Sequence, residues 1–289
     1  MSLPPPIVLS FAGSDPSGGA GIQADILTLA GMGCHPLTVL TAITVQDTVG
    51  VEDILVMDAE WVIDQARAVL QDMPVQAFKI GLLGSVEIVA AITEVISDYP
   101  DIPLVVDPVL ASGRGDMFAD EDVIDAMREM LFPQATIVTP NSIEARRIAF
   151  DDDDDELETM DLKRSADRLL QWGCHYVLIK GAHENTPEVV NVLYDVSGIV
   201  RSDAWQRLPG PFHGSGCTLA SAIAASLAHG LTIMDSVYQA QEFTWHTLKA
   251  GFRPGMGQYL PNRFFWAEEL HDEEDVTHSK NKATEIESN

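Results

Sequence analysis

A glycine-rich turn followed by a helix-forming run is the stretch of this sequence that best suits chemistry. The turn is Gly214-Ser215-Gly216-Cys217, and the alanine-rich segment 219–228 follows it. The first N–H groups of a helix have no partner within the helix, so this turn predicts a backbone site for a phosphate or another anion. The positive end of the helix should also favour the thiolate of Cys217. From these residues alone, a simple helix start with a buried cysteine remains an equally open interpretation.

Polar residues elsewhere in the chain supply the other parts of a phosphoryl-transfer site. Asp107 and Lys180 each follow an apolar run, and Asn141 and Glu144 form an Asn-x-x-Glu pattern at an expected helix start. Phosphoryl transfer needs oxygen ligands for magnesium, a cation for the phosphates, backbone donors and a base. Asn141 and Glu144 lie three residues apart on one side of a helical turn, which suits a magnesium ion held through water. One candidate is present for each role.

The elements that position these residues alternate between short apolar strands and helical patterns, which predicts an α/β fold with a mainly parallel sheet covered on both faces. In such sheets, ligands bind at the carboxyl ends of the strands. The expected strands are 7–12, 37–45, 77–80, 103–108, 136–139 and 176–180, followed by a hairpin of 189–194 with 199–204. The expected helices are 22–32, 60–70, 86–96, 121–131, 162–172, one from 219, and 234–250.

Two further segments lie at predicted strand ends. The loop from Gly13 to Gly21 leads into a helix but matches neither the phosphate loop that ends in Gly-Lys-Ser/Thr nor a dinucleotide fingerprint. Asp25, one turn into that helix, fits the ordinary balancing of a positive helix end. Gln46 carries an acceptor and a donor side by side and so could match an aminopyrimidine edge, although a solvated loop glutamine is the simpler local interpretation.

Composition narrows the class of protein. The chain has 289 residues, 46% hydrophobic, and a formal net charge of −27, which argues against general nucleic-acid binding. No apolar run has the length of a membrane span, the start lacks a basic secretory region, and three scattered cysteines argue against disulfides, so a cytoplasmic location is expected. The acids at 151–156 predict a solvated loop and no metal site. We expect a single domain over 1–266 and an acidic, disordered tail over 267–289.

The sequence resembles the hydroxymethylpyrimidine/phosphomethylpyrimidine kinase family of the ribokinase-like superfamily. The resemblance spans Ile7 to about Ala250, in order. Its first and last motifs are specific to the family, whereas Asn-x-x-Glu and the Gly-x-Gly turn occur across the superfamily. The matching segments are Ala12–Asp25, Thr41–Gln46, Val106–Val109, Thr139–Ala145, Val177–Gly181 and His213–Thr218.

The resemblance implies a three-layer αβα sandwich and an ATP- and magnesium-dependent enzyme. Its expected reactions are phosphorylation of 4-amino-5-hydroxymethyl-2-methylpyrimidine and then of the monophosphate, in thiamine biosynthesis. It implies that Asp25 and Gln46 contact the pyrimidine and that Gly13 and Val109 line its pocket. The remaining roles it implies are phosphate binding by Lys180, an anion hole of Gly214, Ser215 and Gly216, a base at Cys217, and magnesium at Asp107, Asn141 and Glu144. Relatives of this kind are usually homodimers.

Three positions depart from the family pattern. Ser215 replaces the usual threonine and keeps the hydroxyl, Leu82 replaces a pocket methionine, and the loop after Val109 lacks the family's lysine, for which Arg114 could substitute.

Three rival interpretations remain open. Pyridoxal kinase has the same fold and chemistry, but Cys217 with Asp25 and Gln46 favours the pyrimidine. A cysteine nucleophile paired with His213 leaves Asn141, Glu144 and Lys180 unexplained. A ligand-binding regulator on an inactive kinase scaffold would be favoured by a missing base or metal residue, and none is missing.

Overall fold

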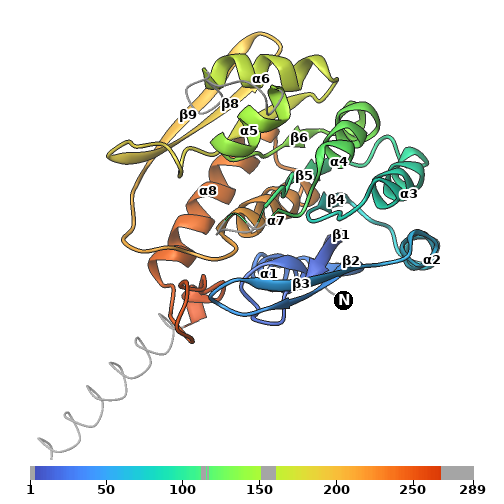
Figure 1. The fold of residues 1–289 in the computed structure, drawn as a ribbon, viewed down its shortest axis with the longest axis horizontal. Helices are drawn as coiled ribbons and strands as arrows, with labels where there is room; N and C mark the ends of the chain where they lie inside the picture. The colour runs from blue at the N-terminus through green and yellow to red at the C-terminus, as the bar shows by residue number, and fades with distance from the viewer. Residues whose placement is uncertain (1–3, 112–114, 116, 151–160, 268–289) are drawn as a thin grey trace, which may run out of the picture.

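One twisted sheet organises the chain. The computed structural model describes residues 4–111, 115, 117–150 and 161–267. Within these residues a nine-stranded sheet has the order β3-β2-β1-β4-β5-β6-β7-β8-β9 (Figure 1). The parallel central strands are β2 (His35–Gln46), β1 (Ile7–Ser14), β4 (Ala77–Ile80), β5 (Leu104–Val106), β6 (Ile137–Val138) and β7 (Tyr176–Ile179). The antiparallel edges are β3 (Val51–Val56) on one side, and β8 (Glu188–Asp195) with β9 (Gly198–Gln206) on the other.

Helices cover both faces of this sheet, because parallel strands present apolar side chains to both sides. One face packs against α1 (Gly21–Gly31), α7 (Ser215–Ala228) and α8 (Ile233–Lys249). The other packs against α2 (Ala59–Leu70), α3 (Val86–Ser97), α4 (Glu121–Ala126), α5 (Ser142–Ala149) and α6 (Leu162–Gln171) (Figure 1). The expected three-layer α/β architecture with a mainly parallel sheet is therefore confirmed.

Two elements differ from the sequence prediction. β3 was not expected, because its sequence Val-Glu-Asp-Ile-Leu-Val carries two adjacent charges and breaks the alternation of a half-buried strand. It pairs with β2 alone at the sheet edge, where exposed side chains are tolerated. The helix expected over 121–131 is regular only to Ala126, then continues as a π-helix over Met127–Leu131 and a 3₁₀ turn over Phe132–Gln134.

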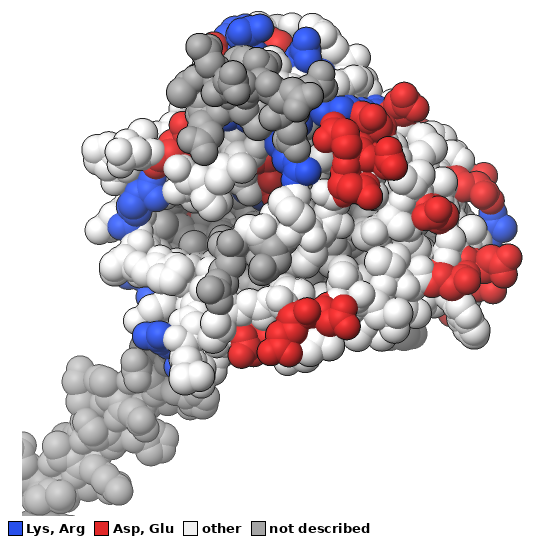
Figure 2. Space-filling model, viewed as in Figure 1, with Lys and Arg blue, Asp and Glu red and all other residues white. Residues whose placement is uncertain are grey.

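The surface keeps the acidic character of the composition. On the face in Figure 2, acidic side chains gather in several groups, while Lys and Arg lie mainly toward the top and left of the view. In the described part of the chain, no helix is both long and apolar enough to cross a membrane. The acidic run 151–156, Arg114 and residues 268–289 of the expected tail lie outside the described residues.

A buried ion pair joins three elements beneath the ligand-binding edge. Lys79 of β4 and Asp25 of α1 have fully buried side chains, and Lys79 Nζ lies 2.8 and 2.9 Å from the two carboxylate oxygens. Ser221 of α7 donates to the same carboxylate at 2.7 Å. Because an unpaired charge is very costly in such surroundings, each partner requires the other.

Removal of one partner should therefore destabilise the fold more than removal of both. We expect Lys79→Met to lower the free energy of unfolding by about 3–5 kcal/mol, the usual cost of breaking a buried pair. The double variant Lys79→Met/Asp25→Asn should regain part of that loss, since no buried charge remains. Urea unfolding at neutral pH measures both. A double variant no more stable than Lys79→Met would contradict this view of the pair.

Candidate active site

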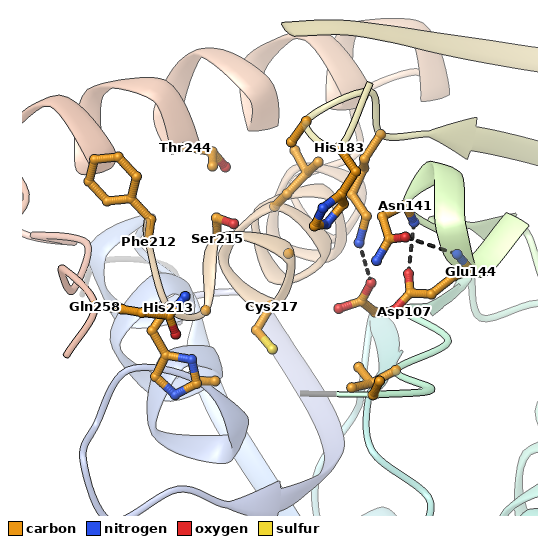
Figure 3. Close-up of a pocket in the computed structure, with 18 of the residues that line it drawn as sticks. Asp107, Asn141, Glu144, His183, Phe212, His213, Ser215, Cys217, Thr244 and Gln258 are labelled. Atoms are coloured by element: carbon orange, nitrogen blue, oxygen red, sulfur yellow. Dashed lines mark hydrogen bonds and ion pairs between the residues drawn. The ribbon is translucent and has the colours of Figure 1, made fainter. Parts of the chain in front are cut away.

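The carboxyl ends of the parallel strands open into one large cavity of about 830 Å³. Segments that follow β1, β5, β6 and β7 line it together with the first turn of α7 (Figure 3). Of the residues proposed from sequence, the cavity is lined by Gly13, Gln46, Asp107, Val109, Asn141, Glu144, Lys180, Gly214, Ser215, Gly216 and Cys217. Residues at the carboxyl ends of the strands, from positions 13 to 217 of the chain, therefore lie together in the fold.

The turn before α7 has the form of an anion cradle. Gly214 has φ of 76°, a left-handed conformation that favours glycine, and α7 begins at Ser215. A Cβ at Gly214 would overlap the carbonyl of Gly19, and a Cβ at Gly216 would lie 3.0 Å from Lys180 Nζ. The glycines therefore allow the turn to pack closely on its neighbours and keep the Lys180 ammonium beside the helix N-terminus.

Two carboxylates, Asp107 and Glu144 (Figure 3), form a polar wall beside the cradle together with Lys180. Lys180 Nζ lies 2.8 Å from Asp107 Oδ1, and Thr139 Oγ1 donates to the same oxygen at 3.2 Å. Glu144 is also in this wall. Burial, together with the charge of nearby Asp107, raises the pKa of Glu144 to about 7 although Lys180 opposes the shift.

Asn141 and Glu144 form a capping box at the start of α5. Asn141 Oδ1 accepts from Ile143 N and Glu144 N, both at 2.9 Å, and Glu144 Oε2 accepts from Asn141 N at 2.7 Å. The amide oxygen of Asn141 is thus used by the helix start. No cluster of three His, Cys, Asp or Glu side chains able to hold a metal occurs among the described residues.

This donor set fits magnesium held with water and phosphate ligands. Asp107 and Glu144 offer hard carboxylate oxygens, and the raised pKa of Glu144 reflects in part the like charge that a divalent cation would balance. Magnesium commonly keeps several waters and takes only one or two carboxylates from the protein.

Cys217 points into the cavity from the first turn of α7 (Figure 3), but its ionisation differs from expectation. Burial raises the pKa of the Cys217 thiol to about 11, and the charges of Asp107 and Asp25 add to this although Lys79 opposes it. The sequence argument counted the positive helix end and omitted desolvation and two nearby carboxylates. In the free protein at neutral pH, Cys217 is therefore a thiol.

Asp25, which the resemblance assigns to the pyrimidine, has a fully buried side chain. It lies in the core, bonded to Lys79 and Ser221, and is not among the described residues that line the cavity. Gly13, Gln46 and Val109 do line it, with Leu82 beside Gly13, where a Cβ would come within 2.9 Å of Leu82 Cδ2. The pyrimidine role of Asp25 stays a prediction. Its ion-pair partner Lys79, in contrast, does line the cavity.

Sequence reasoning gave no role to Lys79, Asp15 or Arg263, and it considered His213 only as the partner of a cysteine nucleophile. Lys79 interrupts the apolar strand Ala77–Ile80, a signal that was available. Asp15 accepts from Ser17 N at 2.9 Å, an Asx turn that Asp-Pro-Ser could have indicated. His213 and Arg263 contact residues far away in the sequence, and no local sequence pattern predicts such contacts.

Arg263 bonds to both the glycine loop before α1 and the first turn of α7. Its guanidinium donates to Thr218 Oγ1 at 3.0 Å, to Gly18 O at 3.3 Å and to Gly19 O. It is 3% exposed, and burial lowers its pKa to about 10. This buried cation therefore holds the glycine loop before α1 against the first turn of α7.

The chain is similar in sequence and fold to kinases that are named for pyrimidine or pyridoxal substrates. A hydroxymethylpyrimidine/phosphomethylpyrimidine kinase from Mycobacterium bovis is 43% identical over 259 residues, covering 88% of this chain and 92% of that protein. The crystal structure of phosphomethylpyrimidine kinase from Clostridium difficile 630 is 34% identical, with a TM-score of 0.70 and coverage of 84% and 99%. The pyridoxal kinase from Staphylococcus aureus in complex with AMP-PCP and pyridoxal is 28% identical, with a TM-score of 0.77 and coverage of 91% and 95%.

The fold and the site together define a phosphotransferase of the ribokinase-like class. The family model described as phosphomethylpyrimidine kinase matches residues 15–262. The chain belongs to the hydroxymethylpyrimidine/phosphomethylpyrimidine kinase family. The family resemblance of the sequence motifs is thereby confirmed.

The raised pKa of Cys217 gives its expected role as base a distinct pH signature. Below the pKa of about 11, the thiolate fraction grows tenfold with each pH unit, so kcat/KM should rise between pH 7 and 10. Cys217→Ala should lose about 10²–10⁴ in kcat together with the pH slope. Cys217→Asp should recover part of the rate with a flat profile, because a carboxylate is already ionised.

Steady-state kinetics between pH 7 and 10 give kcat and kcat/KM for the wild type, Cys217→Ala and Cys217→Asp. Cys174→Ala, a buried cysteine remote from the cavity, is the control and should keep the slope. A wild-type kcat/KM that does not change with pH, or a Cys217→Ala variant with near wild-type kcat, would contradict the role of Cys217 as base. Catalysis would then rest on the anion cradle and the metal alone.

Proposed function

We propose that this protein uses ATP and magnesium to phosphorylate 4-amino-5-hydroxymethyl-2-methylpyrimidine and then its monophosphate in thiamine biosynthesis. The observation that carries the proposal is that a single cavity is lined by Gln46, by Lys180 and by the cradle at Gly214–Cys217. The family membership and the similarity to hydroxymethylpyrimidine/phosphomethylpyrimidine kinases support the same chemistry.

Each end of the cavity suits one substrate. Gly13, Gln46, Leu82 and Val109 line the part of the cavity that we assign to the flat, hydrogen-bonding ring of the pyrimidine. Phe212 and Thr244 line the opposite side of the cradle (Figure 3), where Trp245 and Leu248 add apolar surface suited to a nucleotide base. The phosphates of ATP then lie over the cradle, between the base and the pyrimidine alcohol.

The protein groups divide the work of phosphoryl transfer. N–H groups at the start of α7 stabilise charge that develops on the transferred phosphoryl group, and Lys180 neutralises the phosphates. Asp107 and Glu144 would hold magnesium, and the ion would supply further charge neutralisation and orientation of the phosphates. Cys217, in its thiolate form, takes the proton of the attacking alcohol. Asn141 maintains the helix start that presents Glu144.

Pyridoxal kinase is the second candidate. The pyridoxal-bound Staphylococcus aureus kinase aligns with a TM-score of 0.77, above the 0.70 of the Clostridium difficile enzyme, although its sequence identity is lower, 28% against 34%. Gln46 separates the two candidates, because its side chain can pair with an amino group and adjacent ring nitrogen that pyridoxal lacks.

Substrate preference tests the proposed function. We expect ATP turnover to require the aminopyrimidine alcohol. The kcat/KM for pyridoxal should be lower by a factor of about 10² or more, because the wrong ring leaves the hydrogen-bonding groups of the site unpaired. A coupled ADP-release assay with each alcohol, run with and without magnesium, makes the measurement. A kcat/KM for pyridoxal equal to or above that for the pyrimidine would replace the proposal with the second candidate.

We further propose a homodimer in the cytoplasm. Ile43 and Val45 of β2 and Leu55 of β3 share one face of the edge hairpin and are 44%, 55% and 65% exposed, which supports contact with a second copy. The three cysteines are free, which supports a reducing compartment. Analytical ultracentrifugation of the wild type against Leu55→Glu tests the association.

A further inference from the structure

His213 stands between the two polar groups at the pyrimidine end of the cavity. Its Nε2 lies 2.9 Å from Asp15 Oδ2 and 2.7 Å from the side-chain amide of Gln46. The histidine and aspartate side chains are 11% and 3% exposed. A single ring nitrogen therefore connects the glycine loop, the end of β2 and the cradle turn.

Asp15 determines which atom carries the ring proton. Its carboxylate already accepts from Ser17 N, Ser17 Oγ and Ala20 N at 2.9, 3.0 and 2.7 Å, so every neighbour is a donor and the group is ionised. Burial opposes this charge, but the hydrogen bonds from His213, Ala20 and Ser17 lower the pKa of Asp15 to about 2. His213 Nε2 consequently holds a hydrogen and donates it to Asp15.

This proton sets the orientation of the Gln46 amide. In the structure the amide Nε2 faces His213 at 2.7 Å and Oε1 faces Thr44 Oγ1 at 3.2 Å. Thr44 Oγ1 donates to Ser14 O at 2.8 Å, so its remaining capacity is as an acceptor. A half-turn of the amide, which moves no other atom, turns its NH₂ away from the Nε2 hydrogen and toward the threonine acceptor. The amide oxygen then shares the Nε2 hydrogen with Asp15 Oδ2.

We propose that His213 is a positioning residue for substrate selection, which holds the Gln46 carbonyl toward itself and leaves the Gln46 NH₂ facing Thr44 and the cavity. This inference rests on the proposed pyrimidine substrate. A fixed N–H donor selects a ring edge with a bare nitrogen, as in a 4-aminopyrimidine. It rejects the 4-oxo ring, whose corresponding nitrogen carries a hydrogen, because two donors would meet.

Removal of the histidine should free Gln46 to present either end. We compare kcat/KM for 4-amino-5-hydroxymethyl-2-methylpyrimidine and its 4-oxo analogue. The wild type should prefer the amino ring by about 10²-fold or more. In His213→Phe this ratio should fall by about tenfold or more, because the amide can now turn to accept from the oxo ring. His213→Gln, which keeps a donor, should retain part of the preference, and exposed His35→Phe should retain all of it.

A merely structural role would lower both activities and leave their ratio unchanged, and that result would overturn the inference. The second measurement needs no substrate. Two-bond ¹H–¹⁵N correlation spectra of the wild type, assigned with His213→Gln, should show a hydrogen on Nε2 of His213. A bare Nε2 would equally overturn it. A wild type that fails to phosphorylate the pyrimidine would contradict the proposed function, while the spectrum still decides the orientation.

Discussion

The close approach of two glycines, Gly19 and Gly214, is the constraint on which the site depends. A side chain at Gly214 would overlap the Gly19 carbonyl, and one at Gly19 would overlap the His213 ring. Because both side chains are missing, the loop before α1 packs directly on the turn before α7. Arg263 then bonds to both segments, and His213 bonds to Asp15 across them. The pyrimidine end and the phosphate end of the cavity are thereby held at a set distance, which is what in-line transfer requires.

Charges in the site are held in opposed pairs before any substrate binds. Lys79 with Asp25 and Lys180 with Asp107 are buried or nearly so, and Glu144 shares the second pair's surroundings. Such an arrangement is costly to desolvate but needs little reorganisation when phosphates and a cation arrive. The same desolvation explains why Cys217 is a thiol in the free protein. One physical cause therefore sets both the rigidity of the site and the proton state of its thiol.

Sequence reasoning predicted the parts that depend on local pattern. The alternation of strands and helices defined the parallel sheet, and the strand-end rule assembled Asp107, Glu144 and Lys180 in one wall. It did not find β3, whose charged edge strand lacks a burial pattern. It also misjudged the thiol of Cys217, because a sequence shows the helix end but not the surrounding burial. Contacts between segments far apart in the chain, such as that of Arg263 with Gly19, leave no local signature.

The most direct test of this account is the kinetic effect of Gly19→Ala. The added Cβ would strike the His213 ring and lie 2.8 Å from Leu260 Cδ2, so the His213 ring and the turn that carries it must shift. We predict that kcat/KM for the pyrimidine falls about 10²-fold, the expected cost of a displacement near 1 Å. The neighbouring Gly18→Ala, whose Cβ meets open space, should lose less than about tenfold even with its left-handed φ of 75°. A folded Gly19→Ala enzyme with wild-type kcat/KM would contradict the claim that this glycine contact sets the geometry of the site.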